Sequence, residues 1–309
     1  ETTSTNWQSG TFSTSGLQTV SNLPANAEIL LYIQPQHVQR FYIDNGPDRL
    51  RFLNVVRWGS VQWTNMEGTF YGCENLDNLS PPDQPNFNAV SSMKNMFKNC
   101  NILNFINNIS AWQLGSVSNM ESMFEGCTMF QEEIDTWDVS SVSNMKSMFE
   151  GAASFNWNIN SWQVSSVENF DSMFRGAINF DQELNNWSTG NATNMSNMFR
   201  DAVNFNGSID QWNTEQVLDM SGMFQGASNF NQDISSWITH QVTDMSNTFR
   251  DASNFDQELN SWNVSQVVNF SGMFMNASIF KRDLGNWNTS SGENFNNMFD
   301  GALLFNSNI

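Results

Sequence analysis

The apolar residues of this chain return in a fixed pattern of positions. In one clear copy the relative positions are 0, 3, 6, 7 and 10, and they are occupied by Val142, Met145, Met148, Phe149 and Ala152. This spacing places the apolar side chains on one face of a short helix. Gly151 is expected near the helix end, where glycine takes a left-handed conformation without strain. The apolar residues that follow, within 155–162, predict a short strand or an extended turn.

Two aromatic positions mark the period of the pattern. Tryptophans recur 25 residues apart, at Trp112, Trp137, Trp162, Trp187, Trp212, Trp237, Trp262 and Trp287. The phenylalanine that closes each Met-Phe pair, or its variant, recurs 25 residues apart at Phe124, Phe149, Phe174, Phe199, Phe224, Phe249, Phe274 and Phe299. Earlier members, Phe70 and Phe97, give steps of 27 residues. Because the register is so strict, we expect these aromatic side chains to form interior ladders rather than a binding surface.

A period of this length predicts an α/β solenoid of the leucine-rich-repeat-like class, with about ten coils of 25–27 residues. We expect the repeat solenoid over residues 58–309, with 27-residue steps to about 124 and 25-residue steps after it. Residues 1–57 do not repeat and contain three strand-like runs, at 28–33, 38–43 and 50–56. They predict an N-terminal β-rich cap, since an array needs its first coil covered. A separate binding domain is the alternative for this segment.

The charge balance is strongly acidic, with a formal net charge of −19. It argues against nucleic acid as a partner, because phosphate binding needs a footprint of lysine and arginine. No run approaches the roughly 18–20 apolar residues that a membrane helix needs, so no membrane insertion is expected. The chain starts at Glu1 rather than at methionine. We interpret it as a processed or excised segment, and an extracellular origin would fit the removal of a signal peptide.

No arrangement of residues predicts an enzyme or a cofactor, since the sequence offers no nucleophile with a base, no metal cluster and no phosphate loop. His37 and His240 are isolated, and we expect incidental loop histidines rather than metal ligands or general bases. Three cysteines 27 residues apart, Cys73, Cys100 and Cys127, take the position that alanine holds in later coils. They predict small buried apolar side chains, with a disulfide between neighbouring coils as the alternative.

Acidic residues follow the second phenylalanine of several coils. Stacked carboxylates on one face could bind Ca²⁺, which takes six to eight oxygen ligands, and the candidates are Asp181, Glu183, Asp256 and Glu258. A solvated acidic face is the default interpretation. Trp157, in the same part of its coil, breaks the aromatic register and is predicted to be exposed.

Asparagines recur before the first methionine or phenylalanine of the pattern, as Asn144 does before Met145. They predict an internal asparagine ladder or a repeated helix cap. Asparagines in Asn-x-Ser/Thr sequences are candidates for glycosylation, among them Asn108, Asn186, Asn263 and Asn288.

The full pattern, Asn-Met-x-x-Met-Phe-x-x-Ala-x-x-Phe-x-x-x-Ile-x-x-Trp, resembles the repeat of BspA-like surface proteins over about residues 50–309. That family is a leucine-rich-repeat relative found in bacterial surface proteins and mycoplasma surface lipoproteins. The resemblance implies a secreted or surface-exposed module for adhesion or protein–protein interaction, with proteins or glycans as partners. It supplies no catalytic residues.

The last coil stops at the isoleucine position of the pattern, and Phe305 and Ile309 lie in it. Natural arrays cover such an end, because an open one exposes apolar surface. We therefore expect either further chain or self-association, in which another copy packs head to tail on these residues. The second option predicts a filament, with the chain as its structural subunit, as the alternative to simple surface display.

Overall fold

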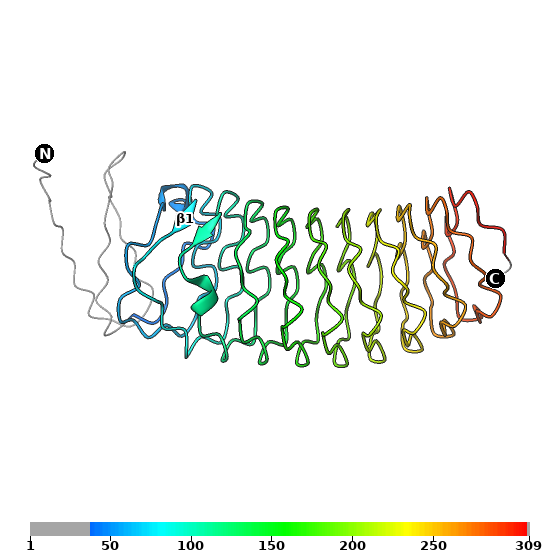
Figure 1. Cartoon of the computed structure of the whole chain (residues 1–309), viewed down its shortest axis with the longest axis horizontal. Helices are drawn as coiled ribbons and strands as arrows, with labels where there is room; N and C mark the ends of the chain where they lie inside the picture. Colours follow the sequence, from blue (N-terminus) through cyan, green and yellow to red (C-terminus); the bar gives the residue numbers. More distant parts are fainter. Residues whose placement is uncertain (1–37, 308–309) are drawn as a thin grey trace, which may run out of the picture. The chain divides into compact units, whose positions relative to one another are not determined.

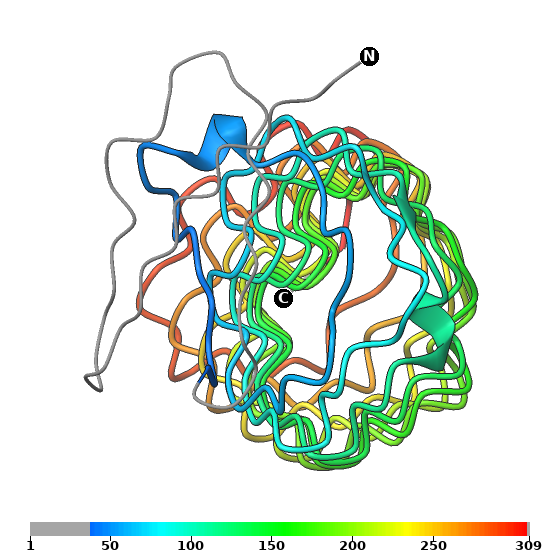
Figure 2. The ribbon, with the colours of Figure 1, turned by 90° about the vertical axis from the view of Figure 1, so that its left-hand side faces the viewer.

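The computed structural model describes residues 38–307 of the chain. The chain divides into two compact units, Glu1–Gln34 and Pro35–Ile309, and the first lies outside the described residues. The second unit is a stack of coils, where a coil is one repeat of the aromatic pattern. Successive coils lie side by side in sequence order (Figure 1), and they overlay one another when viewed along the stack (Figure 2).

Regular secondary structure is sparse within residues 38–307. It consists of η1 (Arg49–Arg51), β1 (Asn78–Leu79), β2 (Phe105–Ile106) and η2 (Ile109–Ala111). Strands β1 and β2 pair in parallel, with Asn78 opposite Phe105 and Leu79 opposite Ile106. All four elements lie at or before Trp112, whereas the later 25-residue coils are held by turns and single parallel bridges.

The helix expected over residues 142–152 is not formed, because these residues make consecutive turns. Ser147 has φ of 53° and Gly151 has φ of 69°. A right-handed helix requires negative φ at every residue, so two left-handed residues four apart exclude it. The same two positions have positive φ in the other coils, where glycine, asparagine or aspartate often occupies them. The left-handed glycine was therefore predicted correctly, but it belongs to a turn and the helical half of the expected α/β repeat is wrong here.

Backbone hydrogen bonds join the coils on this turn side. The backbone N–H groups of every second residue donate to the next coil at 2.7–3.0 Å, namely those of Met145, Ser147, Phe149 and Gly151. The N–H groups between them close turns inside the coil, as Met148 does on the carbonyl of Met145 at 3.1 Å. N–H groups that bond the next coil alternate with N–H groups that bond within the coil. The backbone of the segment is therefore hydrogen-bonded without a helix or a continuous strand.

Side chains join the coils on the opposite side. Asn156 Oδ1 accepts a hydrogen bond from the backbone N–H of Asp181 at 2.9 Å. Asp181 Oδ1 accepts in turn from Asn206 at 2.8 Å, and the series continues through Asn231 to Asp256. We call this series the Asn/Asp ladder. Sequence analysis expected a ladder at the asparagines that precede methionine and did not predict this one.

The asparagines that precede methionine cap turns instead. Asn144 Oδ1 accepts a hydrogen bond from the backbone N–H of Lys146 at 3.0 Å, and the equivalent bond recurs at Asn119, Asn169 and Asn194. An asparagine that bonds the backbone two residues later is typical of a turn. Single parallel bridges also pass through these residues, for example between Asn144 and Asn169.

Three aromatic columns fill the interior of the stack. The tryptophans of the 25-residue series, from Trp112 to Trp287, are at most 6% exposed, and most neighbours stack, as Trp212 and Trp237 do with ring centroids 6.0 Å apart. The first phenylalanine column stacks similarly, with 5.8 Å between Phe149 and Phe174. The second column contains Phe155, whose ring lies 4.1 Å from that of Phe149. Most rings therefore contact aromatic neighbours both within their coil and between coils.

Of the N-terminal β-rich cap expected over residues 1–57, the structure describes residues 38–57. This part contains η1, and no strand is assigned within it. Its backbone bonds to the first coil, where Asp44 donates to the carbonyl of Gly68 at 2.9 Å and Thr64 donates to that of Gln39 at 3.0 Å. Phe52 packs on Phe70 with centroids 5.2 Å apart. The expected strand at 28–33 lies outside the described residues.

Candidate interaction surface

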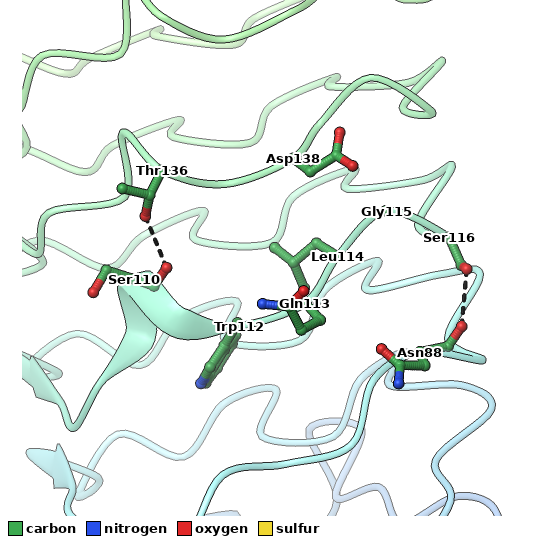
Figure 3. A pocket seen from close by; sticks show the side chains of 9 residues that line it. All are labelled: Asn88, Ser110, Trp112, Gln113, Leu114, Gly115, Ser116, Thr136 and Asp138. Carbon is green, nitrogen blue, oxygen red and sulfur yellow. Dashed lines mark hydrogen bonds between the residues drawn. The ribbon is translucent and has the colours of Figure 1, made fainter.

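A shallow hollow opens where the 27-residue steps give way to 25-residue steps (Figure 3). Its volume is about 360 Å³, and its lining is Asn88, Ser110, Trp112, Gln113, Leu114, Gly115, Ser116, Thr136 and Asp138. Two hydrogen bonds between coils cross it, from Thr136 Oγ1 to the carbonyl of Ser110 at 2.7 Å and from Ser116 Oγ to the carbonyl of Asn88 at 2.8 Å. The lining is mainly hydroxyl, amide and backbone groups.

The hollow also carries an ionised carboxylate. The side chain and backbone N–H of Ser140 both donate to Asp138, and these bonds lower the pKa of that carboxyl. A hollow of about 390 Å³ recurs beside Trp212. There, hydrogen bonds from Asn185 and Gln211 lower the pKa of Asp210. The crevice beside the tryptophan column is thus a repeated feature of the stack rather than a single pocket.

Trp157 differs from the tryptophan column, as the sequence predicted. It is 41% exposed, whereas the column tryptophans are at most 6% exposed. Its indole Nε1–H donates to the backbone carbonyl of Gln131 in the preceding coil. The ring is therefore fixed against one coil while a large part of its surface stays open to solvent.

Trp157 shares its register with side chains that bond back to the preceding coil, in a series that Gly207 interrupts. Gln182 Nε2 donates to Asn156 Oδ1 at 2.9 Å, and Gln232 Nε2 donates to the carbonyl of Asn206 at 2.7 Å. Gln257 and Arg282 make the corresponding bonds to Asn231 and Asp256. We call these residues the donor column. Sequence analysis missed it, although glutamine at three positions of the same register was a signal.

Most of the Ca²⁺ candidates form hydrogen bonds or ion pairs with neighbouring coils. Asp181 and Asp256 belong to the Asn/Asp ladder and accept backbone N–H groups of the next coil. Arg282 pairs with Asp256 at 3.0 Å and with Glu258 at 2.9 Å. Glu183 is exposed. Within residues 38–307, histidine, cysteine, aspartate and glutamate side chains do not gather in groups of three that could hold a metal ion.

Charged side chains form ion pairs between coils on the turn side, which sequence analysis missed. Lys94 pairs with Glu121 at 2.8 Å, and Lys98 pairs with Glu125 at 2.7 Å. In later coils, Lys146 pairs with Asp171 at 2.7 Å and Arg175 with Glu150 at 3.3 Å. Alternation of charge sign at the repeat spacing was the available signal. These pairs place cations on the side of the stack away from the Asn/Asp ladder.

The three cysteines are free and buried. Cys100 Sγ lies 3.1 Å from the carbonyl of Phe70, and Cys127 Sγ lies 3.0 Å from that of Phe97. Burial raises the pKa of the Cys73 thiol to about 12 and raises those of Cys100 and Cys127 as well. The prediction of small buried side chains is in accord with this packing, and the alternative of a disulfide is not.

The remaining candidates are placed as follows. Asn108, Asn186, Asn263 and Asn288 are exposed, and so is His240. Phe305 is half-buried and stacks on Phe280 with centroids 5.8 Å apart. His37 and Ile309 lie outside the described residues, so the expected head-to-tail contact through Phe305 and Ile309 stays a prediction.

The geometry defines a class of protein, namely one in which stacked repeats bury their aromatic pattern and present polar lateral faces. The chain matches the family described as Mycoplasma protein of unknown function, DUF285, over residues 48–132, 91–212 and 193–309. These overlapping matches cover most of the chain, which therefore belongs to this repeat family. None of the curated proteins matches it. In the part of the chain that the structure describes, no helix is long and apolar enough to cross a membrane.

Proposed function

We propose that the chain is a non-enzymatic solenoid module that acts outside the cell by binding a partner through its lateral face. Membership of a repeat family with Mycoplasma members supports this proposal, as does the resemblance of its repeat to that of BspA-like surface proteins. The acidic surface favours solubility and disfavours nucleic acid. Function lies in the outward side chains, since the repeated aromatic residues are used in packing.

The observation that carries the proposal is the exposure of Trp157. Large aromatic side chains are enriched at binding hot spots, because one ring contributes much contact area at little entropic cost. A tryptophan that is 41% exposed, in a protein whose other repeat tryptophans are buried, is such a feature of the lateral face. Its ring is also held in place by the hydrogen bond to Gln131, so little conformational entropy is lost on binding.

Adhesion of coated beads tests the proposal. Beads carrying the chain are incubated with intact animal cells and with a panel of purified extracellular matrix proteins, beside beads carrying an unrelated acidic protein. Wild-type beads are expected to be retained on at least one surface, and Trp157→Gln is expected to reduce the retention severalfold. Leu218→Ala, at an exposed apolar residue in a later coil, is the matched control and is expected to behave as wild type. Retention no greater than that of the unrelated protein would overturn the proposal.

A further inference from the structure

We propose that Trp157 is a stacking platform for the ring of a neutral saccharide, with the amide side chains around it bonding the sugar hydroxyls. This inference rests on the proposed function and names the chemistry of its ligand. The C–H face of a pyranose ring is apolar and matches the face of an indole, whose π-system is negative. The hydroxyl groups at the sugar's edge require neighbouring donors and acceptors, which amides supply together.

Packing alone does not account for a tryptophan at position 157. The donor column needs only a side-chain N–H that reaches back to the preceding coil, and Gln182, Gln232 and Gln257 provide it with a smaller amide. Trp157 makes the same kind of bond to Gln131. Its ring adds an aromatic surface that the bond does not use and that stays open to solvent. That added surface is available for a ligand.

The side chains around Trp157 favour a saccharide over a protein partner. Its neighbours in the chain are Asn156 and Asn158, its backbone acceptor is Gln131, and Gln182 bonds to Asn156 from the next coil. Among residues 131–133, 156–158 and 181–183, Trp157 is the one exposed large hydrophobic side chain. A protein hot spot normally lies in a well-packed pocket, enclosed by contacts that exclude water. A single aromatic ring among amides and carboxylates instead matches a ligand with one apolar face and a polar edge.

Charge restricts the ligand to neutral sugars. Glu133, Asp181 and Glu183 are exposed in the coils beside Trp157. The six residues at 131–133 and 181–183 and the two neighbours of Trp157 include no lysine or arginine. The ion-paired cations Lys94, Lys98 and Lys146 lie on the turn side of the stack. Sialylated or sulfated sugars would meet like charge here, so they are expected to be excluded.

The test is a ¹⁹F NMR titration of the whole chain labelled with 5-fluorotryptophan. The Trp157 resonance is assigned as the one lost in Trp157→Gln, a variant that restores the glutamine of the donor column and so keeps the bond to the preceding coil. Neutral methyl hexosides, N-acetylglucosamine and their oligomers are added to roughly 10 mM, which would detect a Kd of about 1 mM. Sialic acid is the charged comparison.

We expect at least one neutral saccharide to shift the Trp157 resonance, sialic acid to leave it unmoved, and Trp157→Gln to weaken binding by about tenfold. Gln232→Trp places an indole at an equivalent donor position and is expected to create a second responsive resonance. Met129→Ala removes a nearby exposed apolar residue and is expected to change nothing. Should Trp157→Gln fail to fold, the resonance lost in Trp157→Phe supplies the assignment, and the wild-type titration then decides.

The inference is overturned if no neutral saccharide moves the Trp157 resonance, or if sialic acid moves it equally. These results are separable from those of the bead experiment. Retention of beads that depends on Trp157, without any response to saccharides, supports the proposed function with a protein partner and rejects the saccharide. A saccharide response without retention on any surface supports the platform and rejects adhesion.

Discussion

Phe199 and Phe205 stack face to face within one coil, with ring centroids 3.8 Å apart and ring planes 4° apart. Phe199 also stacks on Phe174 and Phe224 in the adjacent coils, at 5.5 and 5.7 Å. One ring therefore links two columns and three coils. Because repeats contact mainly their neighbours, the loss of such a ring weakens two interfaces between coils at once.

Phe199→Ala is accordingly expected to lower the free energy of unfolding by about 3–5 kcal/mol, through lost burial and the cavity left behind. Urea unfolding followed by circular dichroism measures the change. Val203→Ala, at an exposed apolar residue of the same coil, is expected to stay within about 0.5 kcal/mol of wild type. Equal effects of the two substitutions would contradict the importance of the aromatic columns.

The indole N–H groups of the tryptophan column are expected to contribute separately from the rings. Trp212 Nε1 donates to the carbonyl of Leu184 in the preceding coil at 2.9 Å. Trp112 is buried, and among the described residues its Nε1 has no partner. Both substitutions to phenylalanine remove similar ring volume, but only Trp212→Phe removes a hydrogen bond between coils, after which the carbonyl of Leu184 accepts only from the backbone N–H of Trp187. We expect Trp212→Phe to cost about 1–2 kcal/mol more than Trp112→Phe in thermal or urea unfolding. A larger loss in Trp112→Phe would refute this role.

Acid is expected to weaken the ion pair between Lys146 and Asp171. Burial by itself would raise the pKa of Asp171, but hydrogen bonds from Lys146 and Ser172, with the charge of Lys146, lower it overall. A carboxyl whose pKa is lowered in the folded state stabilises the fold at pH values above its unfolded-state pKa, near 3.9. This stabilisation is lost as the pH falls through the folded-state pKa. The hydrogen bond to Asp171 raises the pKa of Lys146. The contribution of Lys146 to stability is therefore present below about pH 10 and is lost as the pH rises further.

Urea unfolding of wild type and Asp171→Asn between pH 7 and pH 2 measures this contribution. The partly exposed pair is expected to give wild type an advantage of less than about 1 kcal/mol at pH 7, which disappears at the acid end. Glu215→Gln, at an exposed carboxylate, controls for the general effect of removing one negative charge. A wild-type advantage in unfolding free energy that grows as the pH falls would contradict this role of the ion pair.

The three thiols are expected to be unreactive in the folded protein. Burial raises the pKa of Cys73 to about 12 and keeps Cys100 and Cys127 protonated as well, so little thiolate is present at pH 8. Ellman's reagent should report almost no thiol before unfolding and three afterwards. Ser161→Cys places a thiol at an exposed residue and should react at once. Rapid reaction of a native cysteine would show that the first coils open readily.

The period of the sequence predicted which side chains are buried but not which backbone they stand on. Met145, Met148 and Ala152 are buried as expected. Turns that close every three residues repeat their apolar positions much as a helix does, so the spacing could not tell the two apart. The left-handed conformation of Ser147 could not be predicted from the residue type, because residues other than glycine seldom have positive φ. Gly222 and Gly272 hold the same position in later coils, and they were the available evidence for turns.

Among the candidate site residues, too, some features could be predicted from the sequence and others could not. Trp157 could be predicted as exposed because it departs from a strict register. The donor column and the hollow beside Trp112 depend on how closely neighbouring coils approach, and single residues do not encode that distance. The Asn/Asp ladder was visible as a recurring choice of asparagine or aspartate after the second phenylalanine, as at Asn206 and Asn231. It was interpreted as an acidic face because its aspartates were considered without its asparagines.

The alternation of donors on the turn side has an evolutionary consequence. A coil such as 138–162 receives hydrogen bonds from the preceding coil in the register in which it donates to the next. Duplication or deletion of one 25-residue unit within the regular part of the stack therefore creates no new kind of junction. Length can vary in whole units while Trp157 and its surroundings stay unchanged, so relatives of different length can present the same exposed residue at different distances from the ends of the stack.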